Sequence, residues 1–567
     1  MNKINLILII IFLSINIPAF SQTIRSPQVL KSINKNKKNF SRADSLRGKL
    51  TPLRTCFDVT FYDINLTINP QNKTIQGYNS IHYKTITPFK RLQIDLFANL
   101  RIDSIISNGE SLVFDRSENA VFVEFSKEQT ALKGKFTVYY KGKPRIAVKP
   151  PWDGGFVWDK DKNGNDWIAV ACEGLGASSW FPLKDHLSDE PDSVSITTTV
   201  PAYLKTISNG VLRNEFPTRH SREGGNLSNW TTYQWFVSYP INSYNITLNI
   251  GDYKSFSDTF QSNNGEIISI DHYVLSYDLE SAKRHFQQVK PMLRCFEAKF
   301  GPYPFPKDGY SLVETPYWGM EHQGAIAYGN HFINNEYGFD FIIIHESGHE
   351  WFGNSISASD HADLWIHEAF TTYSEFLFLE CMQNYNLAVS YLRAHQSLIK
   401  NEIPILGPLD VNFENWGDAD MYYKGASMLH TLRNLVANDS LWFKMLYNMN
   451  SCFRHSVVNA DTIVNYICQA LQNDYHYLFR EYLGYREIPV FQYSISKKNK
   501  EGKSEFSYRW KANEADFIMP LEIYIDNKKT KLKIYPTTKT QKQIVDWTPE
   551  NIKVDLDSYY VGIQQLK

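Results

Sequence analysis

The sequence lacks an excess of charge of either sign. Its 59 Lys and Arg residues balance 60 Asp and Glu residues, which gives a formal net charge of −1. A general basic surface for nucleic acid is therefore not expected. Charged residues make up 21% and hydrophobic residues 43% of the chain, which excludes a disordered chain or a fibrous rod. The 567 residues predict a multidomain globular protein.

Long apolar runs are confined to the N-terminus. Lys3 precedes an apolar stretch over Leu6–Ile17, and Ala19 and Ser21 occupy positions −3 and −1 of a cleavage site after Ser21. A membrane anchor or a buried helix is the alternative, but the run is short and is interrupted by polar residues and a proline. We therefore expect a signal peptide over 1–21, an exported protein in the periplasm or the medium, and no transmembrane segment after its removal.

Cysteine is scarce as well. The spacing of the six cysteines is not that of a small disulfide scaffold, and no C-x-x-C pair suggests a thiolate metal site. Export makes disulfides possible. The sequence does not show which cysteines pair. The six are Cys56, Cys172, Cys295, Cys381, Cys452 and Cys468.

The pattern of apolar residues divides the rest of the chain into four segments. Residues 22–50 carry eight basic residues and one Asp, which predicts a flexible, solvated leader. Short alternating runs over 51–255 predict an antiparallel β-sandwich or saddle. Helical spacing dominates 256–489, and strand patterns return over 490–567 as a small β module. The expected fold class is multidomain α+β.

The segment FIIIHESGHEWFG carries the chemistry. On a helix, His345 and His349 leave the same face one turn apart, so both imidazoles can bind one metal ion. Glu346 then points toward the open side of the metal, the place of a base that takes a proton from zinc-bound water. Because H-E-x-x-H arises by chance in roughly one chain of this composition in fifty, a third ligand is needed to make the prediction specific.

Glu368 supplies that third ligand. Eighteen residues separate it from His349, and this preset spacing lowers the chance rate by about another twentyfold. Three protein ligands leave a fourth position for water, the pattern of a catalytic site with one Zn²⁺ per chain. Glu375 lies two turns along the same face and could support a ligand imidazole through a hydrogen bond; an exposed carboxylate is the alternative.

These motifs resemble the aminopeptidase N family of zinc metallopeptidases, the gluzincins. HESGHEW with Glu368 at the family's spacing, WGMEH as a form of G-x-M-E-N, and YYKGA as a form of Y-x-K-G-A follow in the family's order. The resemblance covers about residue 51 to the C-terminus. It implies a β-saddle N-terminal domain over 51–255, a thermolysin-like catalytic domain over 256–489 and a small β-sandwich over 490–567.

Three roles follow from the resemblance alone. Glu321 matches the glutamate that binds the free α-amine of the substrate, and Glu173, in CEGLGASSWFP, stands where the family places a second amine-binding acid. Tyr422 matches the tyrosine that donates a hydrogen bond to the developing oxyanion. The implied partners are peptides with a free N-terminus.

The sequence also departs from the family. Trp318 replaces the first Gly of G-x-M-E-N and His322 its Asn, while His367 replaces the Asn that usually precedes the third ligand. Leu183 stands where the family often has Cys. We expect these changes to alter substrate preference more than chemistry. The large C-terminal helical domain of many members has no counterpart in this sequence, so a more open active site is expected.

The sequence therefore predicts a zinc aminopeptidase. A zinc endopeptidase of the same class is one alternative, which Glu321 and Glu173 disfavour because anchors for a free amine penalise internal cleavage. A binding or adhesion protein with a decayed metal site is another, which the intact ligands together with Glu346 disfavour.

Overall fold

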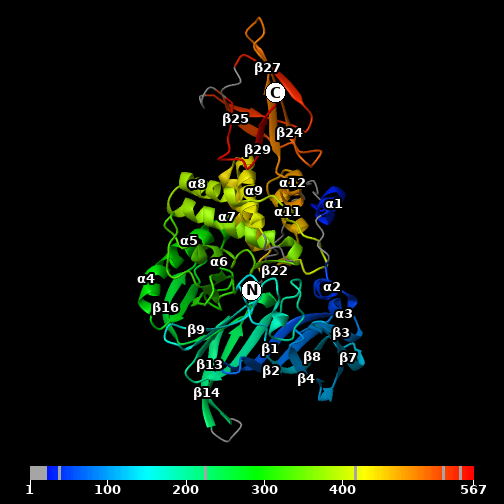
Figure 1. Ribbon diagram of the computed structural model, residues 1–567, viewed down its shortest axis with the longest axis vertical. Coiled ribbons are helices and arrows are strands. Elements are labelled where there is room, and N and C mark those ends of the chain that lie inside the picture. Colours follow the sequence, from blue (N-terminus) through cyan, green and yellow to red (C-terminus); the bar gives the residue numbers. More distant parts are fainter. Residues whose placement is uncertain are drawn as a thin grey trace, which may run out of the picture.

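The protein is elongated, and its β-rich N-terminal part, its helices and its C-terminal sheets follow one another along the long axis (Figure 1). This computed structural model describes residues 22–35, 40–221, 227–413, 418–525, 530–547 and 552–566. The predicted signal peptide lies outside the described residues. Over those ranges, no helix combines the length and the hydropathy needed to cross a membrane. The predicted multidomain α+β class, with an N-terminal β-rich domain, is confirmed.

An eight-stranded sheet dominates the N-terminal part, in the order β13-β14-β11-β1-β2-β8-β4-β5. Its central strand β1 (Phe57–Asn69) pairs in parallel with β11 (Ser193–Pro201) and antiparallel with β2 (Thr74–Thr85). Alternate residues of β1 are buried, as the period of two in the sequence requires. The remaining strands are β4 (Leu100–Ser107), β5 (Glu110–Ser111), β8 (Lys133–Gly142), β13 (Val211–Ser221) and β14 (Leu227–Val237).

Two smaller sheets complete the N-terminal part. One has the order β3-β7-β6 and the other β12-β15-β10-β9, and β10 (Asp166–Ala171) runs directly into the loop that carries Glu173. Their other strands are β3 (Phe89–Asp95), β6 (Val113–Ser117), β7 (Ala120–Gln129), β9 (Gly155–Lys160), β12 (Lys205–Ser208) and β15 (Leu248–Gly251).

The helical part begins with a five-stranded sheet in the order β16-β17-β18-β20-β19. Its strands are β16 (Tyr253–Gln261), β17 (Ile267–Leu275), β18 (Leu312–Glu314), β19 (Gly319–Met320) and β20 (Ile326–Tyr328). The helices are α4 (Leu279–His285), α5 (Val289–Phe300), α6 (Phe341–Gly348), α7 (Trp365–Met382), α8 (Tyr385–His395), α9 (Asp420–Val436), α10 (Asp439–Cys452), α11 (Ala460–Ala470) and α12 (His476–Gly484). A short parallel pair, β21 (Ile356–Ala358) and β22 (Ser456–Val458), joins distant segments of this part.

Helix α7 lies at the centre of the helical part, and glycines let the neighbouring helices α6 and α9 approach it closely. A Cβ atom on Gly348 of α6 would lie 2.5 Å from Oγ of Ser374 on α7. A Cβ atom on Gly425 of α9 would lie 2.5 Å from Cβ of Ala369 on α7. Both distances are too short for a side chain, so the glycines of H-E-S-G-H and Y-x-K-G-A bring α6 and α9 against α7.

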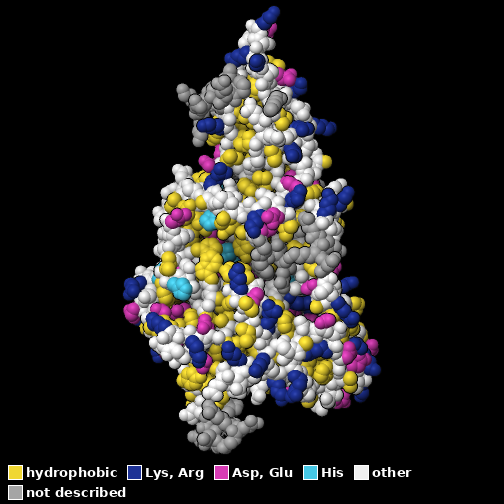
Figure 2. Space-filling model, in the orientation of Figure 1, with side chains coloured by type: hydrophobic (Ala, Val, Ile, Leu, Met, Phe, Trp, Pro, Cys, Tyr) yellow, Lys and Arg dark blue, Asp and Glu magenta, His cyan; other side chains and the backbone are white. Residues whose placement is uncertain are grey.

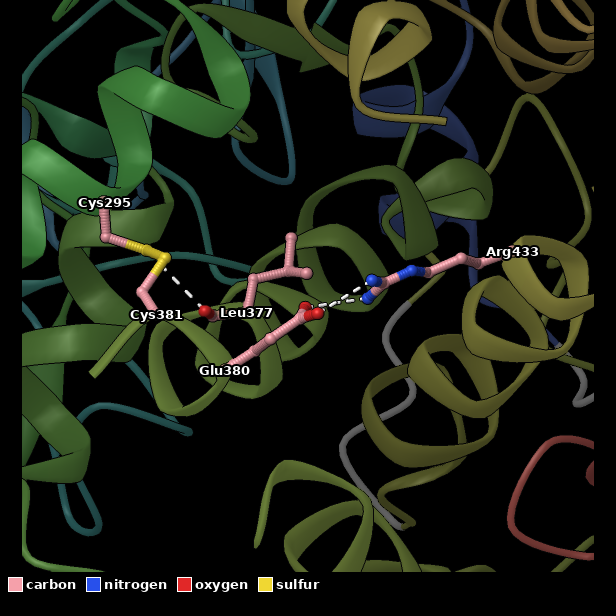
Figure 3. Close-up of a disulfide and its surroundings, with 5 residues drawn as sticks. All are labelled: Cys295, Leu377, Glu380, Cys381 and Arg433. Atoms are coloured by element: carbon pink, nitrogen blue, oxygen red, sulfur yellow. Dashed lines mark hydrogen bonds and ion pairs between the residues drawn. A yellow bond between two sulfur atoms is a disulfide. The ribbon is translucent and has the colours of Figure 1, made fainter. Parts of the chain in front are cut away.

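A disulfide and an ion pair also fix α7 to its neighbours (Figure 3). The structure pairs Cys295 of α5 with Cys381 of α7, which settles part of the pairing that the sequence leaves open. On the other side, both carboxylate oxygens of Glu380 accept hydrogen bonds of 2.8 Å from the Arg433 guanidinium of α9. The helix is thus tied covalently on one side and by a bidentate pair on the other.

The C-terminal part consists of two small sheets that enclose aromatic side chains. Their orders are β27-β24-β23-β29 and β26-β25-β28. Trp510 and Phe517 are buried between them with ring centroids 5.5 Å apart. The strands are β23 (Val490–Ile495), β24 (Ser504–Lys511), β25 (Leu521–Ile525), β26 (Thr530–Ile534), β27 (Gln541–Val545), β28 (Lys553–Val554) and β29 (Gly562–Gln565).

The segment after the predicted signal peptide is packed against the protein. It forms α1 (Pro27–Lys35), α2 (Arg42–Gly48) and α3 (Pro52–Thr55), and α1 lies beside α12 (Figure 1). Ile24 is fully buried, and Arg25 forms an ion pair of 2.7 Å with Asp363. The expectation of a flexible leader over 22–50 is therefore wrong for its described residues. We call residues 22–35 and 40–55 the N-terminal strap.

Charge on the surface is mixed, in keeping with the balanced composition. On the face shown in Figure 2, Lys and Arg side chains are interspersed with Asp and Glu side chains along the length of the molecule.

Candidate active site

His345, His349 and Glu368 converge in a cavity of about 470 Å³. The Nε2 atoms of the two histidines are 3.3 Å apart. Oε2 of Glu368 lies 3.5 Å from Nε2 of His345 and 3.6 Å from Nε2 of His349. Helix α6 ends at Gly348, earlier than the helical pattern suggests, but His349 at its C-cap still faces the same centre as His345. The predicted ligand set is brought together.

This set fits a divalent cation. Oε2 of Glu368 is buried and accepts no hydrogen bond, although it faces two imidazole nitrogens. A carboxylate oxygen in such surroundings is unfavourable without a positive charge beside it. Two imidazoles and one carboxylate form a ligand set that catalytic zinc sites use. The chemistry of the donor atoms therefore matches the zinc predicted from the sequence.

Hydrogen bonds on the far sides of the rings orient both histidines. Nδ1 of His345 lies 2.6 Å from Oε1 of Glu375, and Nδ1 of His349 lies 2.9 Å from the carbonyl oxygen of Phe352. The Tyr391 hydroxyl donates a hydrogen bond to the second oxygen of Glu375. Since Nδ1 of each ring is engaged, Nε2 is left to face the centre. Glu375 is fully buried, so the alternative of an exposed carboxylate is excluded.

Glu346 and Glu321 face the same centre from two elements. One carboxylate oxygen of each and one ring nitrogen of His349 all lie within 4.8 Å of one another. Oε1 of Glu346 would lie 2.5 Å from a Cβ atom on Gly319, so strand β19 passes directly against this carboxylate. Oε1 of Glu321 accepts a hydrogen bond of 2.8 Å from the Tyr244 hydroxyl. Burial raises the pKa of the Glu321 carboxyl above its usual range.

Tyr422 and Glu173 line the same cavity. The Tyr422 ring stacks on the His345 ring with centroids 6.0 Å apart. Burial, and then the nearby carboxylates of Glu368 and Glu173, raise the pKa of the Tyr422 phenol well above its usual value. The hydroxyl is therefore a hydrogen-bond donor at neutral pH. Lys424, two residues along, donates to the carbonyl oxygens of Tyr485 at 3.0 Å and Arg486 at 2.8 Å and so ties α9 to the chain after α12.

The departures from the family motifs separate into those that reach the cavity and those that do not. Trp318 lines it and is 44% exposed. His367 is buried, and its Nε2 accepts a hydrogen bond of 2.8 Å from the backbone of Ala358. His322 and Leu183 are also fully buried and do not line the cavity. Of these four changes, only the one at Trp318 is placed to contact a ligand.

Several cavity or supporting residues were not predicted. Trp152 comes from a loop of the N-terminal part, and Tyr244 and Tyr391 support Glu321 and Glu375 from segments far away in the sequence. No local motif marks these residues. For Trp152 the sequence offers a weak indication of a role in the site, since this residue lies in the proline-rich KPPWDGG segment.

Fold and site together place two histidines and a glutamate around one buried centre, a ligand arrangement that catalytic zinc sites use. Residues 284–482 match the Peptidase family M1 domain. This match covers about a third of the chain and agrees with the predicted resemblance to the aminopeptidase N family of zinc metallopeptidases, a family that implies the predicted zinc cofactor.

The relatives in sequence are longer than this chain. The probable aminopeptidase 2 of Sulfurisphaera tokodaii is 22% identical over 521 residues, which cover 88% of this chain and 62% of the relative. The leucyl aminopeptidase of Saccharolobus solfataricus is 21% identical over 491 residues, which cover 83% and 59%. The chain thus spans about three fifths of the length of these relatives.

A solved structure has the same fold over nearly all of its own length. The M1 zinc metallopeptidase from Deinococcus radiodurans superposes with a TM-score of 0.62 at 22% identity, over 76% of this chain and 95% of that one. A mutant of that enzyme bound to a Tyr-Ser-Ala substrate superposes with a TM-score of 0.61, over 75% and 94%.

Proposed function

We propose that the protein is a zinc-dependent aminopeptidase that hydrolyses the first peptide bond of peptides with a free N-terminus. The observation that carries this proposal is the short distance from Glu321 to Glu346 and His349, whose polar atoms lie within 4.8 Å of one another. A carboxylate that binds an ammonium group so close to the base leaves room for one residue between the amine and the attacked carbonyl. An internal peptide bond has no amine to place there, which disfavours the endopeptidase alternative.

The residues divide the reaction among them. His345, His349 and Glu368 would hold a zinc ion, which would supply Lewis acidity toward the scissile carbonyl and the attacking water. The Glu346 carboxylate accepts the proton of that water and returns it to the leaving amine. The Tyr422 hydroxyl donates a hydrogen bond to the carbonyl oxygen as that oxygen gains negative charge.

The substrate is held through its charge. Glu321 and Glu173 accept hydrogen bonds from the α-ammonium group and fix the position of the first residue. Glu375 holds the His345 ring in place through Nδ1 and does not touch the substrate.

We also propose the finer domain assignment. The described sheets and helices, and the likeness to the M1 zinc metallopeptidase from Deinococcus radiodurans over 76% of the chain, support a β-saddle over 51–255 and a thermolysin-like catalytic domain over 256–489. The two small sheets after Val490 support a β-sandwich over 490–567.

Export remains part of the proposal. The signal-like sequence over 1–21 and the Cys295–Cys381 disulfide support it, because disulfides persist mainly in oxidising compartments. The mature protein should begin at Gln22 and be found in the periplasm or the medium. Mass spectrometry of the intact protein after cell fractionation tests this, and a full-length chain in the cytoplasm would contradict it.

Metal content and product analysis test the function. The purified protein should contain about one zinc per chain, and mass spectrometry of digested free-amine peptides should detect single N-terminal residues. Fragments from internal cleavage would favour the endopeptidase alternative. A zinc-loaded protein without any peptidase activity would favour the binding protein.

A further inference from the structure

Two tryptophans form an aromatic wall in the cavity. Trp318 is 44% and Trp152 45% exposed, and their ring centroids are 6.3 Å apart. The Trp318 ring stacks on Phe341 at 5.3 Å, and its Nε1 donates a hydrogen bond of 3.0 Å to Asn330. Both indoles are therefore large apolar surfaces open to the cavity, and Trp318 is held in a fixed orientation.

The segment from Trp318 to Glu321, which contains strand β19, places the two tryptophans relative to the substrate. Glu321, at one end, faces the proposed position of the amine. Gly319 lies against Glu346, where a Cβ atom would be 2.5 Å from Oε1, and so marks the attacked peptide bond. Trp318 is the next residue away from Glu321. A peptide that extends from the amine past the base therefore meets Trp318 after the scissile bond.

We propose that Trp318 and Trp152 form a subsite for an aromatic or large aliphatic side chain at the second residue of the substrate. This proposal rests on the aminopeptidase function proposed above. An apolar side chain covers indole surface that is otherwise hydrated, whereas a carboxylate placed there loses water without gaining a partner from the rings.

Tripeptides that differ only at the second residue test the subsite. Wild type should release Leu from Leu-Phe-Gly with a kcat/KM roughly five- to tenfold higher than from Leu-Ala-Gly, and Leu-Asp-Gly should be the poorest substrate. Trp318→Gly, which restores the family's residue, should remove the preference for Phe over Ala. Trp318→Phe should retain part of it, because a ring remains. Tyr535→Ala removes an exposed aromatic residue of the C-terminal part and serves as the control that keeps the preference.

The outcomes separate this proposal from the function on which it rests. Release of Leu at equal kcat/KM from all three peptides, or an unchanged preference in Trp318→Gly, would overturn the subsite and leave the aminopeptidase function standing. Failure of wild type to release Leu from any of them would overturn both.

A second inference concerns Arg47 of the N-terminal strap, and it stands on different contacts. Arg47 Nη1 donates hydrogen bonds to the carbonyl oxygen of Gly174 and, at 2.7 Å, to Oδ1 of Asn412. Its Nε lies 3.3 Å from Oδ2 of Asp185. Gly174 directly follows Glu173, so one guanidinium from the strap joins the loop of a proposed amine anchor to two other segments.

The loop after strand β10 is built around this guanidinium. Gly174 and Gly176 have φ angles of +53° and +93°, in the region that favours glycine. A Cβ atom on Gly176 would lie 2.1 Å from Oδ2 of Asp185 and 2.4 Å from Nη2 of Arg47. The loop backbone therefore packs directly on the pair of Arg47 and Asp185.

We infer that Arg47 is a positioning residue that holds Glu173 toward the substrate amine, an inference that again rests on the proposed function. Arg47→Gln should raise KM for free-amine peptides roughly tenfold with little change in kcat, because the amine is held less well in the ground state and the transition state alike. Arg47→Lys keeps the charge but not the fork of donors and should restore part of the loss. Lys49→Gln, exposed on the same segment, is the control.

A double-mutant cycle with Glu173→Gln tests whether Arg47 acts through Glu173. If Arg47 acts through Glu173, Arg47→Gln should add little to the KM of the Glu173→Gln variant. Independent, multiplying effects, or a loss of thermal stability with an unchanged KM, would overturn the inference. If wild type cleaves N-acetylated and free peptides equally well, the proposed function fails instead, and the inference fails with it.

Discussion

Oε1 of Glu375 lies 2.6 Å from Nδ1 of His345, on the side of the ring that faces away from the metal centre. The same carboxylate accepts a hydrogen bond from Tyr391, and its burial leaves it no contact with solvent. Although burial lowers the pKa of His345, the neighbouring carboxylates of Glu368 and Glu375 raise it well above the usual value. The surroundings of this ring therefore favour a positive charge, which is what a bound zinc ion provides.

Removing the support behind His345 should weaken zinc binding. Glu375→Gln keeps the shape of the side chain but loses the charge, and we expect zinc affinity to fall roughly 10- to 100-fold. Competition with a chelator of known affinity measures this. The exposed carboxylate of Glu336 offers a control in Glu336→Gln. Equal affinity in the Glu375 variant and wild type would contradict the supporting role.

Glu346→Gln should retain zinc and fold but lose nearly all turnover. The amide cannot accept the proton of the attacking water, and removal of a general base usually costs at least about 10²-fold in kcat. Zinc analysis and thermal unfolding of the variant control for metal loss and misfolding. Full activity in the zinc-loaded variant would show that another group is the base.

Loss of the Tyr422 hydroxyl should lower kcat. Tyr422→Phe keeps the ring that stacks on His345 and removes one hydrogen-bond donor, so kcat should fall by roughly 10²-fold or more with little change in KM. Tyr423→Phe removes the hydroxyl of the neighbouring tyrosine, whose ring packs on His395 at 4.8 Å, and should lose far less. A change mainly in KM would instead make Tyr422 a substrate-positioning residue.

A partly buried carboxyl outside the site should make stability depend on pH. Burial, with a further contribution from Asp189, raises the pKa of Glu190 to about 7, and the carboxyl faces Ser357 of β21. An unfolded glutamate titrates near pH 4.3, so the contribution of Glu190 to stability is complete below about pH 4 and is lost as the pH rises to about 7. At 1.4 kcal/mol per pKa unit, the loss is about 4 kcal/mol at most.

Glu190→Gln removes this titration and keeps the shape of the protonated side chain. Relative to wild type, the variant should be more stable to urea at pH 8 and should lose that advantage at pH 5. The difference between the two proteins is the quantity to measure, because titration of other groups cancels in it. The same difference at both pH values would contradict the assignment.

The site was predictable where its residues are close in sequence or repeat a family spacing. H-E-x-x-H predicts two ligands and a base from helical geometry alone, and Glu368 follows from its spacing. Glu375 was left open, because its burial depends on packing against Tyr391. Trp152 was missed, because a residue of the N-terminal part enters the cavity only through the tertiary fold.

The N-terminal strap shows why a charge pattern misleads. The eight basic residues over 22–50 predicted a solvated segment, but Arg25, Arg47 and Arg54 of the strap each pair with an acid far away in the chain. Arg25 pairs with Asp363. Arg54 is buried and pairs with Asp95. Such partners cannot be read from local composition, since each is brought near by the fold of another part of the chain.

The central claim, that the protein recognises a free N-terminus, is tested most directly by comparing free and N-acetylated forms of one peptide in wild type and Glu321→Gln. Wild type should cleave the free peptide far better. The variant should lose roughly 10- to 150-fold in kcat/KM for the free peptide, the value of one charge-assisted hydrogen bond, and should discriminate much less between the two forms. Equal cleavage of free and acetylated peptides by wild type would contradict the aminopeptidase function and favour an endopeptidase.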